Sequence, residues 1–315
     1  MLTWNDRDNH SPRKKVVNEE QAYKSPQALR QAVTDRLRAI AKPKGRWTLV
    51  ELQRQFAYDR LLARLYAIDD SWVLKGAVAL LARQISVRHS IDIDMYRDGE
   101  RVIVERELRA AAELDLGDWF RFEVGAGETL TGGTGGMRYP VMALVGPTSW
   151  ATFHTDIVGT GVRMTGVPDD VPPVAGISVP GIEQPGYRAY PLVDHIADKF
   201  AAIIEPHGDG RPSTRFRDLL DLAALVVAVR VGATDQRVAI MSEIDRRGLR
   251  MPDGFDAPDR SLWEGGFARV ARRAVEPPAR TLDEALAIVR PFVDPVLSGT
   301  AAGSWDPESG RWTGE

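Results

Sequence analysis

Two aspartates in an apolar segment are the residues of this chain best suited to chemistry. Asp92 and Asp94 alternate with isoleucines, and Asp92 lies sixteen residues after Gly76. If residues 91–96 form a strand, both carboxylates project from one face. Two carboxylates held close together repel each other unless a cation lies between them, and Mg²⁺ commonly joins carboxylates to substrate phosphates. The spacing therefore indicates nucleotide chemistry.

The segment before these aspartates predicts a phosphate site. Residues 72–74 read as a short strand, Gly76 as a turn and residues 77–84 as a helix. Backbone N–H groups at Gly76 and Ala77 can bind a triphosphate, and Lys75 adds positive charge. The alternative is a solvated Asp-x-Asp segment after an ordinary glycine turn. The order strand, turn, helix, acidic strand favours the nucleotide site.

A third carboxylate, Asp156, lies on another predicted strand, residues 151–158. If the two acidic strands are neighbours, the three carboxylates converge. Asp92 and Asp94 would then hold Mg²⁺, and Asp156 would bind the metal beside the attacking hydroxyl. Ser90 points to the same face as Asp92 and Asp94, because alternate residues of a strand share a face. The alternative for Asp156 is a strand residue that faces solvent.

A second charged cluster lies in the C-terminal half of the chain. Lys199 follows His195 by one helical turn, and Asp218 and Asp221 share a helix face. Arg217 is placed to pair with Asp221. Such pairs are commonly solvated or structural. Here apolar neighbours predict a helix buried over much of its surface, where charged groups need partners or a ligand.

Composition limits the function classes. The chain has 315 residues, 43% of them hydrophobic and none of them cysteine, which excludes disulfides, thiolate zinc sites and cysteine nucleophiles. No apolar run is long enough for a membrane span and no signal peptide is visible, so we expect a cytoplasmic protein without membrane contact. Residues 1–46 carry eleven Lys and Arg against five Asp and Glu, a net charge of +6, and the whole chain carries −3, which leaves −9 for the rest. The basic arm suits RNA, although for residues 1–20 a disordered, solubilising tail is the simpler interpretation.

The ordered motifs resemble the AbiEii/MenT-type nucleotidyltransferase toxins of bacterial type IV toxin–antitoxin and abortive-infection systems. These toxins belong to the DNA polymerase β-like nucleotidyltransferase superfamily. The resemblance covers about residues 45–230. It rests on Lys75-Gly76-Ala77, Arg88-His-Ser90-Ile-Asp92-Ile-Asp94, Asp156, Asp198-Lys199 and Arg215-Phe-Arg217-Asp218-Leu-Leu-Asp221.

The resemblance implies a two-lobed α+β fold, in which a nucleotidyltransferase core with a small mixed sheet is joined to a helical C-terminal domain. Helical periodicity predicts helices over residues 27–41, 48–67, 102–114, 192–204, 214–230, 235–247, 261–274 and 282–297. The expected organisation is a disordered basic tail (1–24), a nucleotidyltransferase domain with N-terminal helices (25–185), a helical domain (186–298) and a disordered tail (299–315).

The resemblance also implies an activity. Such toxins transfer a nucleotide, with CTP the favoured donor here, to the 3′ acceptor end of tRNA, which blocks aminoacylation and translation. A cognate antitoxin is the implied protein partner.

The resemblance assigns roles to residues in three groups. Asp92, Asp94 and Asp156 would bind Mg²⁺; Lys75, Gly76, Ala77, Ser90 and Lys199 would bind the nucleotide; Asp221 would be an active-site acid. Lys199 and Asp221 are also counted among the catalytic residues. Ala77 departs from the family pattern, which has Ser or Gly there, so one hydroxyl contact to phosphate is missing.

Two alternatives remain open at this point. The same chemistry can transfer the nucleotide to a protein hydroxyl or to a small molecule, because the metal ligands do not distinguish which molecule carries the attacking hydroxyl. The chain can also be a non-catalytic nucleotide-binding module, against which the three intact aspartates argue.

Overall fold

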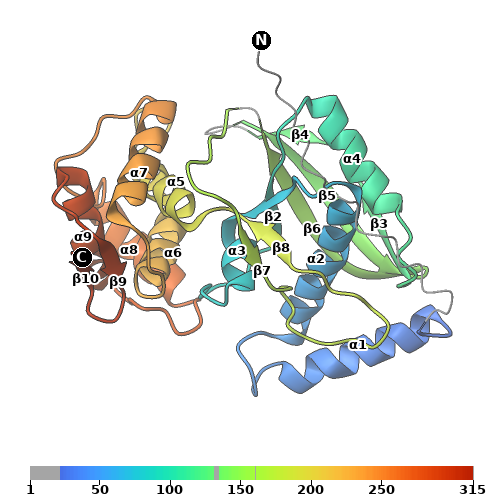
Figure 1. Ribbon diagram of the computed structural model, residues 1–315. Helices are drawn as coiled ribbons and strands as arrows, with labels where there is room; N and C mark the ends of the chain where they lie inside the picture. The colour runs from blue at the N-terminus through green and yellow to red at the C-terminus, as the bar shows by residue number, and fades with distance from the viewer. Residues whose placement is uncertain (1–21, 131–134, 160, 315) are drawn as a thin grey trace, which may run out of the picture.

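The computed structural model describes residues 22–130, 135–159 and 161–314, and it has two lobes (Figure 1). One lobe is built on a β-sheet with helices packed on it, and the other is almost entirely helical. Most of the predicted basic tail, residues 1–21, lies outside the described residues. The mixed α and β composition and the two lobes agree with the predicted fold class.

In the described part of the chain, eight strands form one mixed sheet, larger than the small sheet predicted. Seven strands follow the order β3-β5-β6-β2-β1-β8-β7, and β4 pairs with β5. At its centre, β2 runs parallel to β6 and antiparallel to β1. The strands are β1 (Val73–Lys75), β2 (Asp92–Tyr96), β3 (Phe120–Val124), β4 (Glu128–Thr129), β5 (Met137–Val145), β6 (Thr148–Val158), β7 (Asp169–Val171) and β8 (Tyr187–Ala189).

The helices of the sheet lobe are α1 (Pro26–Ile40), α2 (Leu49–Ile68), α3 (Gly76–Ala82) and α4 (Arg101–Glu113). Helix α2 begins at a capping box, in which the Thr48 side chain and the Glu51 side chain each satisfy a backbone N–H of the other's residue. Its buried face packs on the sheet in the first hydrophobic core. Helix α1 lies outside α2, away from the helical lobe (Figure 1).

The helical lobe contains α5 (Leu192–Ile204), α6 (Phe216–Val226), α7 (Ala233–Arg247), α8 (Arg260–Ala271) and α9 (Leu282–Ser298). These helices enclose a second core, which Leu80 and Val87 of the sheet lobe also join. Helix α6 is shorter than the predicted 214–230. The boundary predicted at residue 186 falls just before β8, which belongs to the sheet. Among the described residues, no helix is both long and apolar enough to cross a membrane.

The predicted disordered tail at 299–315 is wrong for the described residues 299–314. Strands β9 (Ser304–Asp306) and β10 (Arg311–Thr313) form a hairpin there. Trp305 is 1% exposed, its indole N–H donates to the Val226 carbonyl, and it packs against Phe292. A segment rich in Gly and Ser is ordered because two tryptophans bury large apolar surfaces against α9 and α6.

Candidate active site

The three aspartates lie side by side on two neighbouring strands. In the parallel pair β2 and β6, Asp94 is in register with Asp156, and Asp92 is in register with His154. Burial alternates along β2, where Ile93 and Met95 are buried in the core and the aspartates are half-buried on the other face. The predicted convergence of the acidic strands is therefore confirmed as geometry.

The pKa of Asp94 is raised by its position in this cluster. Burial, and after it the neighbouring charges of Asp156 and Asp92, raise the pKa of its carboxyl to about 7, although Lys75 and Lys199 lower it. A carboxyl that resists ionisation beside two others is a group that a bound cation would stabilise in its charged form.

Gly76 allows the turn before α3 to approach this carboxylate. Its φ is +60°, and a Cβ placed there would lie 1.8 Å from Asp94 Oδ2. Only glycine fits both the left-handed backbone and the close approach. Ala77, the next residue, is buried, so the missing family hydroxyl leaves a methyl group packed at this turn.

Lys75 connects the site to the helical lobe. Its ammonium lies 4.0 Å from the centre of the Tyr190 ring and 4.0 Å from Asp198 on α5. Asp198 is also paired with Arg247 of α7. Burial alone would raise the pKa of Asp198, but Lys75 and Arg247 lower it to about 2, so this carboxylate is charged at neutral pH.

Lys199 and Asp221 meet in the interior between the lobes. Lys199 Nζ donates to Asp221 at 2.7 Å and to Asp218 at 3.0 Å. Arg88 of the sheet lobe makes bidentate hydrogen bonds to the Asp221 carboxylate, at 2.7 and 2.9 Å. Burial alone would raise the pKa of Asp221, but Lys199 and Arg88 lower it to about 2. The predicted pair of Arg217 with Asp221 is wrong, because Arg217 is exposed and Arg88 takes that place.

Ser90 lies just before β2 rather than within it. Its hydroxyl donates to the Asp92 carbonyl at 3.0 Å, and the Tyr58 hydroxyl donates to the Ser90 carbonyl at 2.8 Å. These bonds shape the entry of the chain into the acidic strand.

Arg138 and His154 also belong to the carboxylate cluster, and sequence reasoning missed both. Arg138 on β5 makes two hydrogen bonds to Asp156, at 2.7 and 2.6 Å, and lies 3.6 Å from Asp92. His154 Nδ1 lies 3.2 Å from Asp92 Oδ1. Their signal is register alone, since Arg138 is opposite Asp156 and His154 is opposite Asp92.

The donor chemistry of this cluster fits a hard divalent cation, since all three acids offer carboxylate oxygens. Within the described residues, however, no three His, Asp or Glu side chains are already grouped as a metal site. The guanidinium of Arg138 is the positive charge that lies between Asp92 and Asp156 instead.

The comparison with protein families decides the assignment. The model of the family described as nucleotidyl transferase AbiEii toxin, type IV toxin–antitoxin system, matches residues 60–290, which include every aspartate of the site. This chain is a member of the AbiEii family. It is accordingly a nucleotidyltransferase of the type IV toxin class, a class that implies an antitoxin partner.

Solved structures are similar to this AbiEii-family chain at low sequence identity. MenT4, a nucleotidyltransferase toxin from Mycobacterium tuberculosis H37Rv, is 18% identical, with a TM-score of 0.48, over 83% of this chain and 99% of that chain. JHP933 from Helicobacter pylori is 15% identical, with a TM-score of 0.37, over 82% of this chain and 86% of that chain. A search of the curated proteins finds no match.

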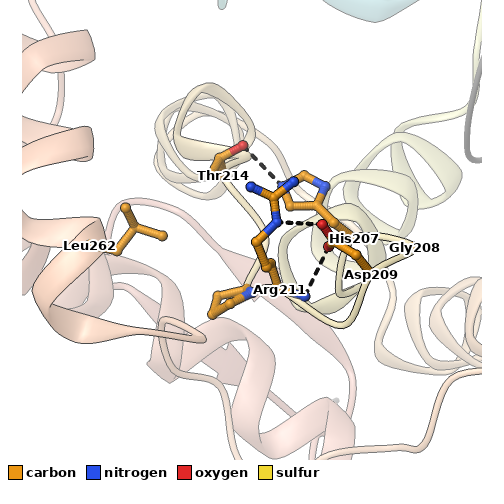
Figure 2. A pocket seen from close by; sticks show the side chains of 7 residues that line it. His207, Gly208, Asp209, Arg211, Thr214 and Leu262 are labelled. Carbon is orange, nitrogen blue, oxygen red and sulfur yellow. Dashed lines mark hydrogen bonds and ion pairs between the residues drawn. The ribbon is translucent and has the colours of Figure 1, made fainter.

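One cavity of this AbiEii-family chain lies away from the carboxylates. It has a volume of about 660 Å³ and is lined by the loop between α5 and α6 and by Leu262 of α8 (Figure 2). Arg211 and His207 face it, paired with Asp209 and Thr214. None of its lining residues is an acid of the site.

Proposed function

We propose that this toxin transfers a nucleoside monophosphate from a nucleoside triphosphate, with CTP the favoured donor, to the 3′ end of tRNA in a Mg²⁺-dependent reaction. The acceptor hydroxyl oxygen forms a bond to the α-phosphorus, and pyrophosphate leaves. A nucleotide added at this end blocks aminoacylation and so stops translation.

The observation that carries the proposal is the register of Asp94 with Asp156, beside Asp92 on the same face. Three carboxylates on adjacent strands of a rigid sheet are a donor set for Mg²⁺. The cation supplies charge neutralisation for the triphosphate and the departing pyrophosphate. Asp92, Asp94 and Asp156 are the residues proposed to hold it.

The nucleotide phosphates are proposed to bind between the lobes. Lys75 of β1 and Lys199 of α5 bring positive charge, and the N–H groups of Gly76 and Ala77 are further donors. An ammonium has three N–H groups, and Lys199 uses two of them on Asp218 and Asp221, so one remains for a phosphate oxygen. Asp221 is then a positioning residue that fixes the direction of Lys199. Ser90, whose hydroxyl is held by the Asp92 carbonyl, is proposed to support the phosphate site through the strand entry.

Exposed arginines of the helical lobe favour RNA as acceptor. The Arg211 and Arg215 side chains are 77% and 60% exposed in the segment that leads into α6, which also carries Asp218 and Asp221. Arginines presented to solvent on the segment that leads into α6 suit the phosphates of a nucleic acid strand.

The test is transfer from each α-labelled nucleoside triphosphate to total tRNA with Mg²⁺, by the wild-type chain and by Asp92→Ala. Asp98→Asn, an exposed aspartate just beyond β2, is the matched control. We expect label on tRNA from CTP with the wild type and with the control, none with Asp92→Ala, and activity that falls steeply with salt.

Other outcomes discriminate between the alternatives. Label on a protein band or a small molecule, with none on RNA, would move the acceptor to another class while keeping the chemistry. Full activity of the Asp92→Ala variant would refute the site itself, and no label on any acceptor would favour a nucleotide-binding module.

A further inference from the structure

Arg138 is placed where a cation is needed. It lies on β5 directly opposite Asp156 in the antiparallel pair with β6, and both of its hydrogen bonds to that carboxylate are shorter than 2.8 Å. The same guanidinium lies 3.6 Å from Asp92. A planar fork that contacts a carboxylate with two N–H groups is the strongest form of ion pair that a side chain offers.

The other cations near the cluster already have partners of their own. Lys75 faces Asp198, and Lys199 is bonded to Asp218 and Asp221. Of the lysines and arginines that the structure describes, Arg138 is the one with ion pairs to two of the three clustered aspartates.

The position of Arg138 differs from that of a structural arginine in this sheet lobe. Arg64 is fully buried and binds Asp118, the Leu114 carbonyl and the Phe120 carbonyl. The Arg138 side chain is 37% exposed, and within the described part of the chain its hydrogen bonds go to Asp156 alone. Its side chain can therefore turn to solvent without unpacking the core.

We propose that Arg138 is an internal counter-ion that competes with the divalent cation for Asp92 and Asp156. This inference rests on the proposed metal-dependent function. When a divalent cation binds these carboxylates, the guanidinium must give up its two bonds to Asp156. Arg138 thereby lowers the affinity of the site for metal and stabilises the carboxylate cluster when metal is scarce.

The test measures binding of Mn²⁺ alone by calorimetry, with no nucleotide, for the wild type and Arg138→Gln. Arg121→Gln is the matched control, because Arg121 is a 62% exposed arginine on the adjacent strand β3, away from the cluster. We expect Arg138→Gln to bind Mn²⁺ about tenfold to hundredfold more tightly, since a charge-assisted pair no longer has to be broken. The melting temperature of Arg138→Gln should fall without Mn²⁺ and recover with it, and Arg121→Gln should behave as the wild type.

Unchanged or weaker Mn²⁺ binding by a folded Arg138→Gln variant would overturn the inference. If Arg138→Gln does not fold, Arg138→Lys replaces it, because lysine keeps the charge but lacks the planar guanidinium. Arg138→Lys should then bind Mn²⁺ a few-fold more tightly than the wild type. Mn²⁺ binding no tighter than that of the wild type would overturn the proposal. The proposed function survives these failures as long as the wild type binds Mn²⁺. Absence of Mn²⁺ binding in the wild type and in both variants would overturn the inference and the metal-dependent function together.

Discussion

Asp221→Asn is the substitution whose cost the structure defines best. Asp221 is fully buried and bridges Lys199 of α5 to Arg88 of the sheet lobe. Asparagine keeps the size and removes the charge, so Arg88 loses its carboxylate partner and Lys199 retains only Asp218. Breaking a buried pair by removing one partner costs about 3–5 kcal/mol. Because Asp218 remains, we expect the lower end, about 3 kcal/mol, which for a chain of 315 residues is a loss of roughly 4–5 °C in melting temperature.

The assay is thermal and urea unfolding followed by circular dichroism. Asp209→Asn is the matched control, because Asp209 is 51% exposed and pairs with the exposed Arg211; it should cost less than about 1 kcal/mol. Combining Asp221→Asn with Arg88→Gln should cost less than the sum of the two single changes, because the double variant leaves no unpaired arginine. A melting temperature of Asp221→Asn within about 2 °C of the wild type would refute the reasoning.

Three further changes test other parts of the structure. Gly76→Ala should abolish transfer because its Cβ would strike Asp94, whereas Gly117→Ala, with an equally positive φ but open space around it, should leave transfer intact. In chelator, the pKa of Asp94 is about 7 in the folded chain and 3.8 when unfolded, so the folded chain binds more protons between these values. Stability should therefore fall as pH rises from 4 to 7, and Asp94→Asn should remove that slope in pH-dependent unfolding; a parallel slope in the variant would contradict the assignment. Trp305→Ala should cost about 3–5 kcal/mol in urea unfolding, and a loss below 1 kcal/mol would mean that the hairpin does not stabilise the helical lobe.

Periodicity predicted most of the elements, because both lobes bury regular apolar faces. The limits of α5 are the predicted 192–204. The alternation of Asp92 and Asp94 with apolar residues predicted their shared face, since a strand has only two faces. The sequence also placed Asp218 and Asp221 on one face of a helix, and both contact Lys199.

Contacts between residues far apart in the chain could not be predicted from the sequence. Arg138 is opposite Asp156 only because of how the β5–β6 hairpin pairs, and a register shift between Ala143 and Leu144 changes the count from the turn by one residue. Without that irregularity, counting back from the turn would place Met137 opposite Asp156. Arg138 would then project from the opposite face of the sheet. The contact of Arg88 with Asp221 joins residues 133 positions apart, for which no local pattern exists.

The ion pairs between the lobes determine at which stage of synthesis the site can form. The carboxylates of residues 92–156 and the cations Lys75 and Arg88 leave the ribosome first, while Asp198 and Asp221, to which those cations pair, follow on α5 and α6. Since Trp305 closes the second core from the last hairpin, the site reaches its final shape only when nearly the whole chain has emerged. A chain cut short before α6 lacks Asp221, so both Lys199 and Arg88 lose that partner.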